Sequence, residues 1–498
     1  MCKEEVLKIV KDQTITYEQK VLSLARAAED SLEVLNIPKE TQNLRDEGII
    51  CDLFEGHAPY RPRYIVPDYE KFMKQGSKFL ELDPPEDIWE ATHNLLILYK
   101  HVPSITSFPV YIGNIDELLE PFVKDEDEAY RAIKLFIKHI DRTLTDSFCH
   151  ANIGPRDTIA GRLILKAQRE MQTSIPNITI KYSKSTPERL ALDSIETAMI
   201  TAKPSFANDE MYRADFGGEY AIVSCYNGLY IGGGSYTLVR LNLADLAKKA
   251  KSKADFFERV LPNTSKLMAD YINERIRFLV DESGFFESSF LIREGLIEKD
   301  RFSAMFGVFG LAEGTNALMK MEGESGRFGN DSKADELGLE IIDSLAKLVD
   351  GYESPNCKIS NKKLLMHSQV GIDSDIGISP GCRIPIGEEP ELPIHIKQSA
   401  KFHKYFTSGI GDIFAFDETA KGNTKFIQNI IDGSFKEGMR YFSLYGSDAD
   451  VIRITGYLVK KSEIEKLDKG NQVLRDTVVL GQGSVRNNGV LDRKVRKI

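Results

Sequence analysis

Residues 176–188, with the sequence PNITIKYSKSTPE, decide the fold class. Within them Ile178, Ile180 and Tyr182 alternate with polar residues, which predicts a strand with one apolar side. The Thr186-Pro187 pair suits an N-cap followed by a first helical position, so we expect a helix as far as about residue 200. A strand followed at once by a helix is the unit from which α/β proteins are built.

The alternation of strands and helices continues from about residue 100, which indicates an α/β layer structure. The first ninety or so residues have helical periodicity instead, and Thr16 and Gln19 have the spacing of a capping box. We find no internal repeat and no obvious linker. The sequence therefore predicts a helical N-terminal layer over residues 1–95 and one α/β domain over residues 96–498.

The composition is that of an ordinary globular protein. Of the 498 residues, 42% are hydrophobic and 28% are charged, and 65 basic residues against 75 acidic ones give a net charge of -10. An acidic chain without a long Lys/Arg block is not expected to bind nucleic acid. The N-terminus opens with charged residues, and no apolar run approaches the roughly 20 residues of a membrane-spanning helix. We expect a cytoplasmic protein without a membrane partner.

The six cysteines are scattered without any C-x-x-C pair, so neither a zinc ribbon nor a disulfide framework is indicated. Cys225 ends a predicted strand over 219–225, a position where α/β folds usually place chemistry. The glycine-rich run 228–234 fits neither G-x-G-x-x-G nor a P-loop, so we expect a tight turn there and no phosphate site. Taken alone, such a cysteine is more often a small buried hydrophobic residue.

The C-terminal region predicts a strand over 439–445, then a turn, then an extended segment over 451–460 that contains Gly456. Ser462 and Glu465 have the spacing of a second capping box. Taken alone, Gly456 fits a bulge or bend in a strand as well as a special role.

Two short segments resemble the fingerprints of one family. Residues 453–457 (RITGY) resemble the RVxGY motif of glycyl radical enzymes, with isoleucine in place of valine, and 221–227 (AIVSCYN) resembles the segment that carries their thiyl cysteine. The stretches 176–188, 204–210 and 219–225 follow one another as in that family, and 306–314 resembles a further family segment. As a whole, the chain most resembles the YjjI-type members of this pyruvate formate-lyase-like superfamily.

The resemblance implies a ten-stranded α/β barrel of the glycyl radical enzyme type, in which loops carrying Cys225 and Gly456 meet. Residues from about 435 to 498 would form the glycyl radical segment. Gly456 would store the radical, and Cys225 would abstract hydrogen from a small polar metabolite, leading to C–C or C–O bond cleavage. The radical loop around the glycine would consist of Arg453, Thr455 and Tyr457.

The resemblance also implies partners. A separate S-adenosylmethionine radical activase with an iron-sulfur cluster would install the radical on Gly456. A homodimer and a small-molecule substrate are expected, with no bound metal or nucleotide in this chain.

Glycine and cysteine suit such chemistry. A backbone radical is stabilised when the amide nitrogen and the carbonyl share the spin, which requires a flattened alpha carbon that glycine permits best. A thiol carries the spin onward because its S–H bond is comparable in strength to the bonds that are exchanged. The thiol must stay protonated and the site must exclude water and oxygen, so both loops are expected inside an enclosed scaffold.

Three departures from the family pattern narrow the chemistry. Asn227 stands where many eliminating members have a glutamate base, and an amide does not accept a proton. Ser224 replaces the adjacent cysteine that carries the acyl group in pyruvate formate-lyase. No cysteine follows Cys382, so the four-cysteine zinc site of anaerobic ribonucleotide reductases is lacking. The mechanism is therefore not a direct copy of any of these three.

Several polar residues are candidates for contact with substrate, namely Asn227, Cys149, His150 and His367. Asp373 and Asp375 lie in the polar stretch 367–375, but their ligand set is too incomplete to predict a metal site. Three alternatives stay open: an anaerobic ribonucleotide reductase-like enzyme, a radical-carrying accessory protein without its own turnover, and a metabolite-binding protein that has lost the chemistry.

Overall fold

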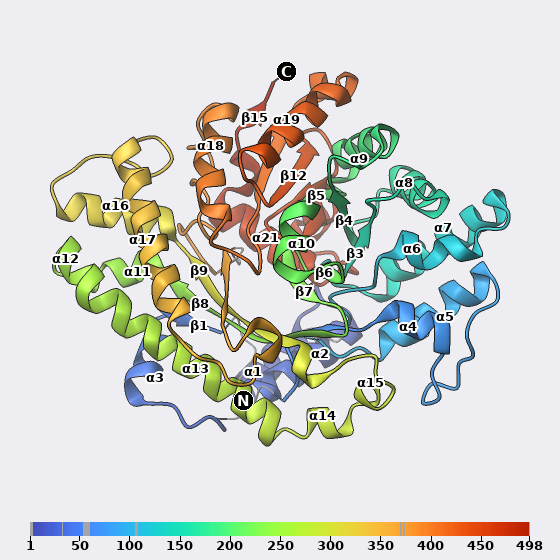
Figure 1. Cartoon of the computed structure of the whole chain (residues 1–498), viewed down its shortest axis with the longest axis horizontal. Coiled ribbons are helices and arrows are strands. Elements are labelled where there is room, and N and C mark those ends of the chain that lie inside the picture. Colours follow the sequence, from blue (N-terminus) through green and yellow to red (C-terminus); the bar gives the residue numbers. More distant parts are fainter. Residues whose placement is uncertain are drawn as a thin grey trace.

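The computed structural model describes residues 3–31, 33–52, 60–104, 108–368, 371 and 374–497. Helices form an outer layer, the longer strands lie inside them, and the hairpin of β6 (Tyr220–Val223) and β7 (Asn227–Tyr230) lies near the centre (Figure 1). The strands of this hairpin pair with each other and with neither of the two large sheets. The two large sheets therefore surround the hairpin without pairing with it.

One sheet has five strands in the order β1-β8-β9-β10, with β2 also paired to β8. Strands β8, β9 and β10 are parallel to one another, whereas β1 and β2 are antiparallel to β8. The N-terminal region is thus mainly helical but also supplies two short strands to this sheet. Its strands are β1 (Ile50–Cys51), β2 (Tyr64–Val66), β8 (Gly233–Asn242), β9 (Phe302–Phe309) and β10 (Leu365–Ser368).

The second sheet has six strands in the order β15-β11-β12-β5-β4-β3. Only the pairing of β12 with β5 is antiparallel. Its strands are β3 (His150–Ile153), β4 (Asn177–Tyr182), β5 (Ser205–Asn208), β11 (Asp412–Phe416), β12 (Tyr441–Gly446) and β15 (Val495–Arg496).

The two sheets approach each other where β10 meets the segment before β11, through a parallel bridge between His367 and Gly409. The predicted α/β class is confirmed. The backbone pairings of the described residues form two large sheets, which meet at this bridge, and two separate two-stranded hairpins.

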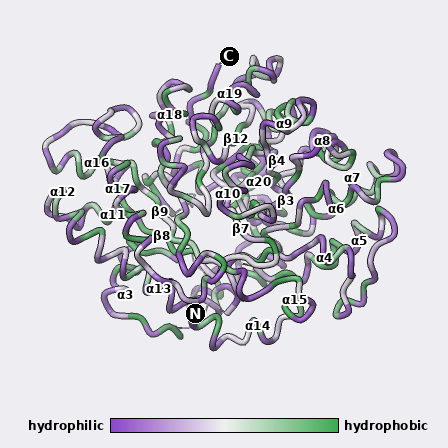
Figure 2. Tube along the Cα trace, viewed as in Figure 1, coloured by the Kyte–Doolittle hydropathy of each residue, from purple (hydrophilic) through white to green (hydrophobic). Residues whose placement is uncertain are grey.

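The helices cover the outer faces of both sheets, and Figure 2 shows hydrophobic and hydrophilic positions alternating along them, as expected for amphipathic helices. In chain order they are α1 (Lys3–Lys11), α2 (Tyr17–Glu29), α3 (Lys39–Asp46), α4 (Tyr69–Gln75), α5 (Ile88–Lys100), α6 (Ile115–Leu119), α7 (Glu126–Thr143), α8 (Ile159–Met171), α9 (Glu188–Thr201), α10 (Asp209–Phe216), α11 (Leu243–Ala247), α12 (Lys253–Asp255), α13 (Leu261–Asp281), α14 (Phe285–Ser288), α15 (Phe290–Arg293), α16 (Leu311–Met321), α17 (Ser332–Asp350), α18 (Leu392–His403), α19 (Thr424–Lys436), α20 (Lys461–Asp468) and α21 (Thr477–Asn488).

Strand β4 is the predicted strand, and all six of its residues are buried. Ile178 and Ile180 belong to the main hydrophobic core, and Tyr182 packs against Phe435 of α19. The helix after it, α9, begins one residue later than expected. Its N-cap residue is Pro187, and the Thr186 hydroxyl accepts from the amide of Ser183 at 3.0 Å instead of capping the helix.

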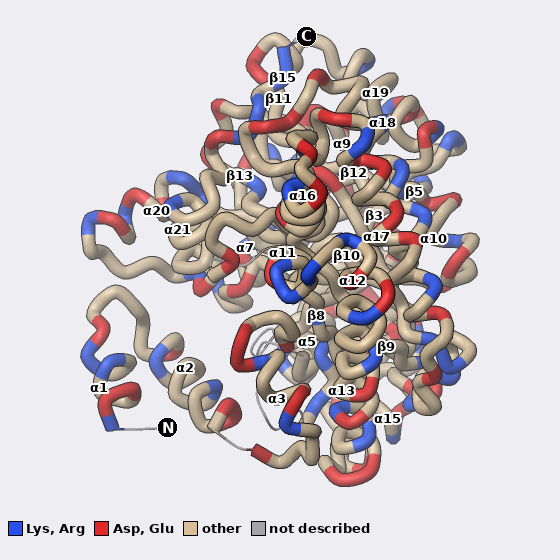
Figure 3. The backbone as a smooth tube through the Cα atoms, turned by 90° about the vertical axis from the view of Figure 1, so that its left-hand side faces the viewer, with Lys and Arg blue, Asp and Glu red and all other residues tan. Residues whose placement is uncertain are grey.

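The N-terminal helices lie close to the C-terminal segment (Figure 3). The predicted capping box of Thr16 and Gln19 is confirmed at the start of α2. The Gln19 amide also donates to the carbonyl oxygens of Val473 and Leu474 at 3.4 and 3.3 Å. The first helices therefore support the part of the chain that carries the glycine motif.

Acidic and basic positions are interspersed over the face drawn in Figure 3, which agrees with the modest net charge. In the part of the chain that the structure covers, no helix combines the length and the apolar character needed to cross a membrane.

Candidate functional site

Cys225 lies at the tip of the central hairpin. Val223 pairs with Asn227, which leaves Ser224, Cys225 and Tyr226 as the turn. The predicted strand over 219–225 is therefore the first half of a hairpin, and it ends at Val223. Ser224 has a φ of +58°, in the left-handed region where a side chain is disfavoured, so the turn reverses the chain before the cysteine.

The glycine-rich run after Cys225 permits close packing. Gly228 lies within β7, where an added Cβ would come within 2.7 to 2.9 Å of the rings of Phe216 and Tyr212. At Gly234, in β8, a Cβ would lie 2.0 Å from the carbonyl oxygen of Tyr64. The expected single tight turn is thus replaced by a strand and the start of another, with Gly232 at a φ of +74° between them.

The hairpin is anchored through both its backbone amides and side chains of other segments. The amide of Ser224 donates to the carbonyl of Val110 at 3.2 Å, and that of Gly228 donates to the carbonyl of Ser408 at 2.9 Å. The side chain of Asn152, in β3, bonds to both the amide and the carbonyl of Ile222 at 2.8 Å. These bonds connect the cysteine hairpin to the six-stranded sheet and to the segments that contain Val110 and Ser408.

The Cys225 thiol is enclosed and neutral. Its residue is 3% exposed, and burial raises its pKa to about 11. The thiol donates weakly to Oδ1 of Asn227 at 3.6 Å. The Asn227 Nδ2 group is buried and has no acceptor among the described residues. A free donor beside the sulfur is therefore available for a ligand oxygen.

Gly456 lies in a second hairpin. Strands β13 (Val451–Arg453) and β14 (Leu458–Lys460) are antiparallel, so the predicted continuous extended segment over 451–460 is two short strands with the glycine in the turn. The second predicted capping box is wrong, because the Ser462 hydroxyl donates to Asp450 at 2.8 Å and α20 has no side-chain cap.

The glycine loop is held mainly by side chains. The Arg493 guanidinium donates to the carbonyls of Arg453 and Ile454 at 3.3 and 3.2 Å. The Thr455 hydroxyl donates to the carbonyl of Gly371 at 3.3 Å, and the Tyr457 hydroxyl lies 3.2 Å from that of Ser484. Residues 451–459 are all buried.

The polar side of β4 connects the two loops. The Asn177 side chain donates to the Gly456 carbonyl at 3.0 Å. Two residues further, the Thr179 hydroxyl lies 2.7 Å from the hydroxyl of Tyr441, which donates to the Cys225 carbonyl at 2.9 Å. Residues two apart on one face of a strand are separated by about 6.6 Å. Adjacent positions on one side of β4 are therefore linked to the two loops, Asn177 directly to the glycine loop and Thr179 through Tyr441 to the cysteine loop.

His150 extends this chain of hydroxyl groups. Its Nε2 lies 2.7 Å from the Thr179 hydroxyl. Burial lowers the His150 pKa to about 3, so the ring is neutral. Because Tyr441 gives its single hydroxyl proton to the Cys225 carbonyl, Thr179 donates to Tyr441, and Nε2–H of His150 donates to Thr179. The predicted residue His150 therefore acts on the cysteine loop through two hydroxyls.

The two other candidate residues, His367 and Cys149, lie in different parts of the structure. His367, in β10, is buried, and its ring centroid lies 5.5 Å from that of Tyr226, next to Cys225. Cys149 precedes His150, so its side chain points to the opposite face, near Tyr69 and Tyr99, whose pKa values are raised mainly by burial and to a lesser extent by Cys149. Cys149 is therefore not grouped with Cys225.

The predicted polar stretch 367–375 also extends over two places, since its first residue lies near Tyr226 and its last lies at a separate cavity. Asp375 forms an ion pair with Arg240, with contacts of 2.5 and 2.9 Å, at a cavity of about 440 Å³ that is lined by neither Cys225 nor Gly456. Asp373 lies outside the described residues. No metal-binding cluster of His, Cys, Asp and Glu occurs in the described ranges.

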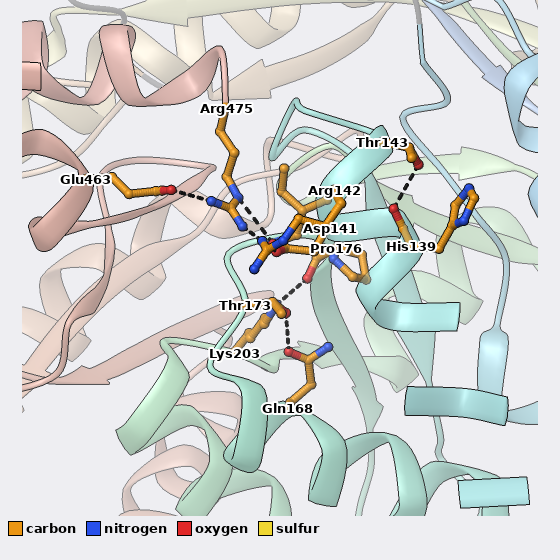
Figure 4. A network of polar contacts seen from close by, with 11 residues as sticks. His139, Asp141, Arg142, Thr143, Gln168, Thr173, Pro176, Lys203, Glu463 and Arg475 are labelled. Carbon is orange, nitrogen blue, oxygen red and sulfur yellow. Dashed lines mark hydrogen bonds and ion pairs between the residues drawn. The ribbon is translucent and has the colours of Figure 1, made fainter. Parts of the chain in front are cut away.

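A buried polar network attaches the C-terminal segment beside β4 (Figure 4). Arg475 binds Glu463 and also Asp141 of α7, with the Nε contact to Asp141 at 3.2 Å. Lys203 donates to the carbonyl of Pro176 at 2.6 Å, directly before Asn177. Burial holds the pKa of Lys203 well below its usual range. The network fixes the start of β4 where the glycine loop rests on it.

Sequence reasoning missed Asn177, Thr179 and Tyr441. Asn177 and Thr179 alternate with isoleucines in a strand that is buried on both faces, and buried polar residues in such a pattern need partners. That alternation was a usable signal. Nothing local distinguished Tyr441.

Comparisons with known proteins identify the family of this chain. The model of the family described as "Glycyl radical enzyme YjjI-like" matches residues 15–496. An uncharacterized protein of Haemophilus influenzae is 46% identical over 99% of this chain and 97% of its own length. The YjjI protein of Escherichia coli, described as uncharacterized, is 43% identical over 98% of this chain and 95% of its own.

Solved structures of glycyl radical enzymes share the fold. The glycerol-bound form of the B12-independent glycerol dehydratase from Clostridium butyricum has a TM-score of 0.69 at 11% identity, covering 100% of this chain and 89% of its own. The anaerobic ribonucleotide reductase from Thermotoga maritima, in complex with dATP and CTP, has a TM-score of 0.67 at 12% identity, covering 93% of this chain and 92% of its own. With the family match over nearly its whole length and relatives of 46% and 43% identity, the chain belongs to the YjjI-like glycyl radical enzyme family.

Proposed function

We propose that this protein is an oxygen-sensitive enzyme in which a glycyl radical on Gly456 generates a thiyl radical on Cys225. The Cα radical takes the hydrogen atom from the S–H group, so that Gly456 regains its C–H bond and the sulfur holds the unpaired electron. The thiyl then takes a hydrogen atom from a small polar metabolite, and a C–C or C–O bond of the substrate radical breaks. The hydrogen returns from sulfur to the product radical.

One observation carries the proposal. Asn177 and Thr179, neighbours on the polar side of β4, hold the Gly456 loop and, through Tyr441, the Cys225 loop. Short separation of radical store and thiol is what the transfer requires. The raised pKa of Cys225, about 11, keeps the S–H bond intact for transfer at neutral pH.

The surroundings of the sulfur favour a polar substrate. The buried Asn227 Nδ2 offers a hydrogen bond, and Arg383, whose Nε donates to Gly411 at 2.8 Å, lies with its guanidinium carbon 5.9 Å from the Tyr226 ring. Arg383 and Arg453 both act on the Cys225 pKa as cations. A substrate with an oxygen acceptor or a carboxylate would match these donors. His367 is a further candidate for substrate contact.

The radical needs an external source. A radical S-adenosylmethionine activase with an iron-sulfur cluster would supply the adenosyl radical that takes the Gly456 hydrogen atom. The homodimer and the cytoplasmic location stay predictions. Glycerol dehydratase and ribonucleotide reductase are fold neighbours at about 12% identity, so neither substrate is transferred to this chain.

Anaerobic activation with a candidate activase, followed by electron paramagnetic resonance, tests the proposal. We expect a glycine-centred doublet, and exposure to air should cleave the chain at Gly456, as measured by intact mass. Gly456→Ala is the matched control and should give neither the doublet nor the cleavage. A doublet centred on another residue, or cleavage elsewhere, would contradict the proposal.

A further inference from the structure

We infer that Asn177 is a positioning residue that tunes the Gly456 radical by donating a hydrogen bond to its carbonyl oxygen. The inference rests on the proposed function. Asn177 Nδ2 lies 3.0 Å from that oxygen, and both groups are buried. At this separation the hydrogen lies about 2 Å from the oxygen.

The chemistry of a glycyl radical makes this contact matter. The amide nitrogen pushes electron density toward the alpha carbon, and the carbonyl withdraws it, so the spin spreads over both. A hydrogen bond donated to the carbonyl oxygen strengthens the withdrawal and fixes the plane of the carbonyl group. Asn177 therefore stabilises the radical form relative to the closed-shell glycine and also orients it.

Arg453 reinforces the donor. Its Nη2 donates to Asn177 Oδ1 at 3.1 Å and to the carbonyl of Ala202 at 2.8 Å. Burial lowers the Arg453 pKa to about 10, so the guanidinium still carries its charge at neutral pH. A cation on the amide oxygen polarises the Asn177 side chain and makes its N–H group a stronger donor. The first residue of the RITGY motif thus acts on the glycine through Asn177.

The backbone holds Asn177 in place independently of the loop. Its amide donates to the Cys149 carbonyl at 2.9 Å, and the preceding carbonyl, that of Pro176, accepts from buried Lys203 (Figure 4). The donor therefore belongs to the sheet and the acceptor to the C-terminal segment. The contact forms only when the glycine loop is docked on β4.

Asn177→Asp tests the inference, because it keeps the shape and the acceptor for Arg453 but replaces the donor by an oxygen. After anaerobic activation of the full chain we expect a clear doublet in the wild type. In Asn177→Asp we expect the doublet intensity per chain to be about tenfold lower, because the free energy of one hydrogen bond corresponds to about a tenfold change in an equilibrium. We also expect the splitting of the doublet to change. Asn152→Asp, the same change on β3 at a residue bonded to the cysteine hairpin, should keep the wild-type splitting.

The outcomes are distinguishable. A wild-type splitting and yield in Asn177→Asp overturns the inference and leaves the proposed function intact, whereas the lack of a doublet in the wild type means that the proposed function has failed. If Asn177→Asp does not fold, wild-type protein labelled with ¹⁵N-asparagine is measured by electron-nuclear double resonance. A coupling from an asparagine nitrogen to the glycyl spin, relative to unlabelled protein, supports the inference, and no such coupling overturns it.

Discussion

The two hairpin turns that are linked through β4 differ in what holds them. The cysteine turn is bound partly by amides, since that of Ser224 and that of the neighbouring Gly228 donate to carbonyls of other segments. Two hydroxyls complete the set, because those of Tyr441 and Tyr212 donate to the carbonyls of Cys225 and Tyr226 at 2.9 and 2.8 Å. The glycine turn is bound by side chains that reach it from elsewhere, above all those of Asn177 and Arg493. Backbone bonds survive most substitutions of the residues that make them, whereas a side-chain bond disappears with its residue. Single substitutions should therefore change the glycine turn more than the cysteine turn.

Both turns are buried, but each belongs to a hydrophobic cluster of its own. Cys225 belongs to a small cluster of aromatic residues with Tyr212, Tyr226 and Tyr441. The glycine turn belongs to a different cluster, which includes Ile454 and Tyr457. Each turn therefore has its own packing, and the two are linked along β4 by Asn177, which bonds to the glycine turn, and by Thr179, which reaches the cysteine turn through Tyr441. A substitution can consequently affect one function without the other.

The largest effect is expected from Cys225→Ala, which separates the two turns functionally. Turnover should fall to background because no sulfur remains to carry the spin. The glycyl doublet should still form, because the glycine turn and its side-chain contacts are unchanged. Turnover with a substrate and the doublet are measured on the same activated sample. Retained turnover would mean that Cys225 is not the hydrogen-abstracting group, and would favour a radical carrier that serves another protein.

A smaller but still large effect is expected from Arg475→Met, which weakens the attachment of the C-terminal segment. Arg475 and Asp141 are 4% and 1% exposed, so the substitution leaves a buried carboxylate without its main cation. Removing one partner of a buried ion pair typically costs about 3–5 kcal/mol, and we expect the free energy of unfolding to fall by that amount. Urea unfolding measures it, and limited proteolysis should show earlier cleavage in the C-terminal segment than around Cys225.

Arg142→Met is the matched control for this prediction. Arg142 pairs with the same Asp141, but its side chain is 52% exposed, so the loss should be about 0–1 kcal/mol. Equal losses in the two variants would contradict the view that the buried Arg475 contact holds the glycine side.

Enclosure of the cysteine turn can be measured by alkylation. Burial raises the pKa of Cys225 to about 11, so the thiolate fraction at pH 8 is on the order of 0.001, about a hundredfold below that of an ordinary thiol. Half-buried Cys51, at the cavity beside Arg240, should react with iodoacetamide at least a hundredfold faster than Cys225 in peptide mass spectrometry. Because the neutral thiol is favoured below the raised pKa, turnover should not fall through thiol ionisation between pH 7 and 10. Rapid labelling of Cys225 at pH 8 would show that the turn is open.

The sequence predicted the elements whose signal is local. The apolar alternation of β4 and the capping box at Thr16 follow from neighbouring residues, and both are present. The predicted cap at Ser462 failed because Asp450, twelve residues earlier, takes the hydroxyl. The strand ending at Cys225 was misjudged because Tyr220–Val223 is as apolar as a buried sheet strand, and the positive φ of Ser224 leaves no trace in composition.

The contacts of the candidate site could not be predicted in the same way. Asn177 and Gly456 are 279 residues apart, and Thr179 and Tyr441 are 262 apart, so only the folded chain pairs them. The sequence motifs identified the two reacting residues as candidates. The polar side of β4, which holds both turns, follows from topology.

The smallest effect is expected from Thr179→Val, which tests whether the cysteine turn depends on its backbone anchors. The change keeps the shape but removes the hydroxyl between His150 and Tyr441, so the buried His150 N–H loses its acceptor. Leaving such a group unsatisfied costs about 1–3 kcal/mol of unfolding free energy, measured by urea denaturation. Turnover should fall only modestly, because the backbone bonds of Ser224 and Gly228 still hold the turn, and Thr179→Ser, which restores the hydroxyl, should recover most of the loss. If Thr179→Val abolishes turnover as fully as Cys225→Ala does, the cysteine turn depends on a side-chain relay as much as the glycine turn does, and the distinction between the two turns fails.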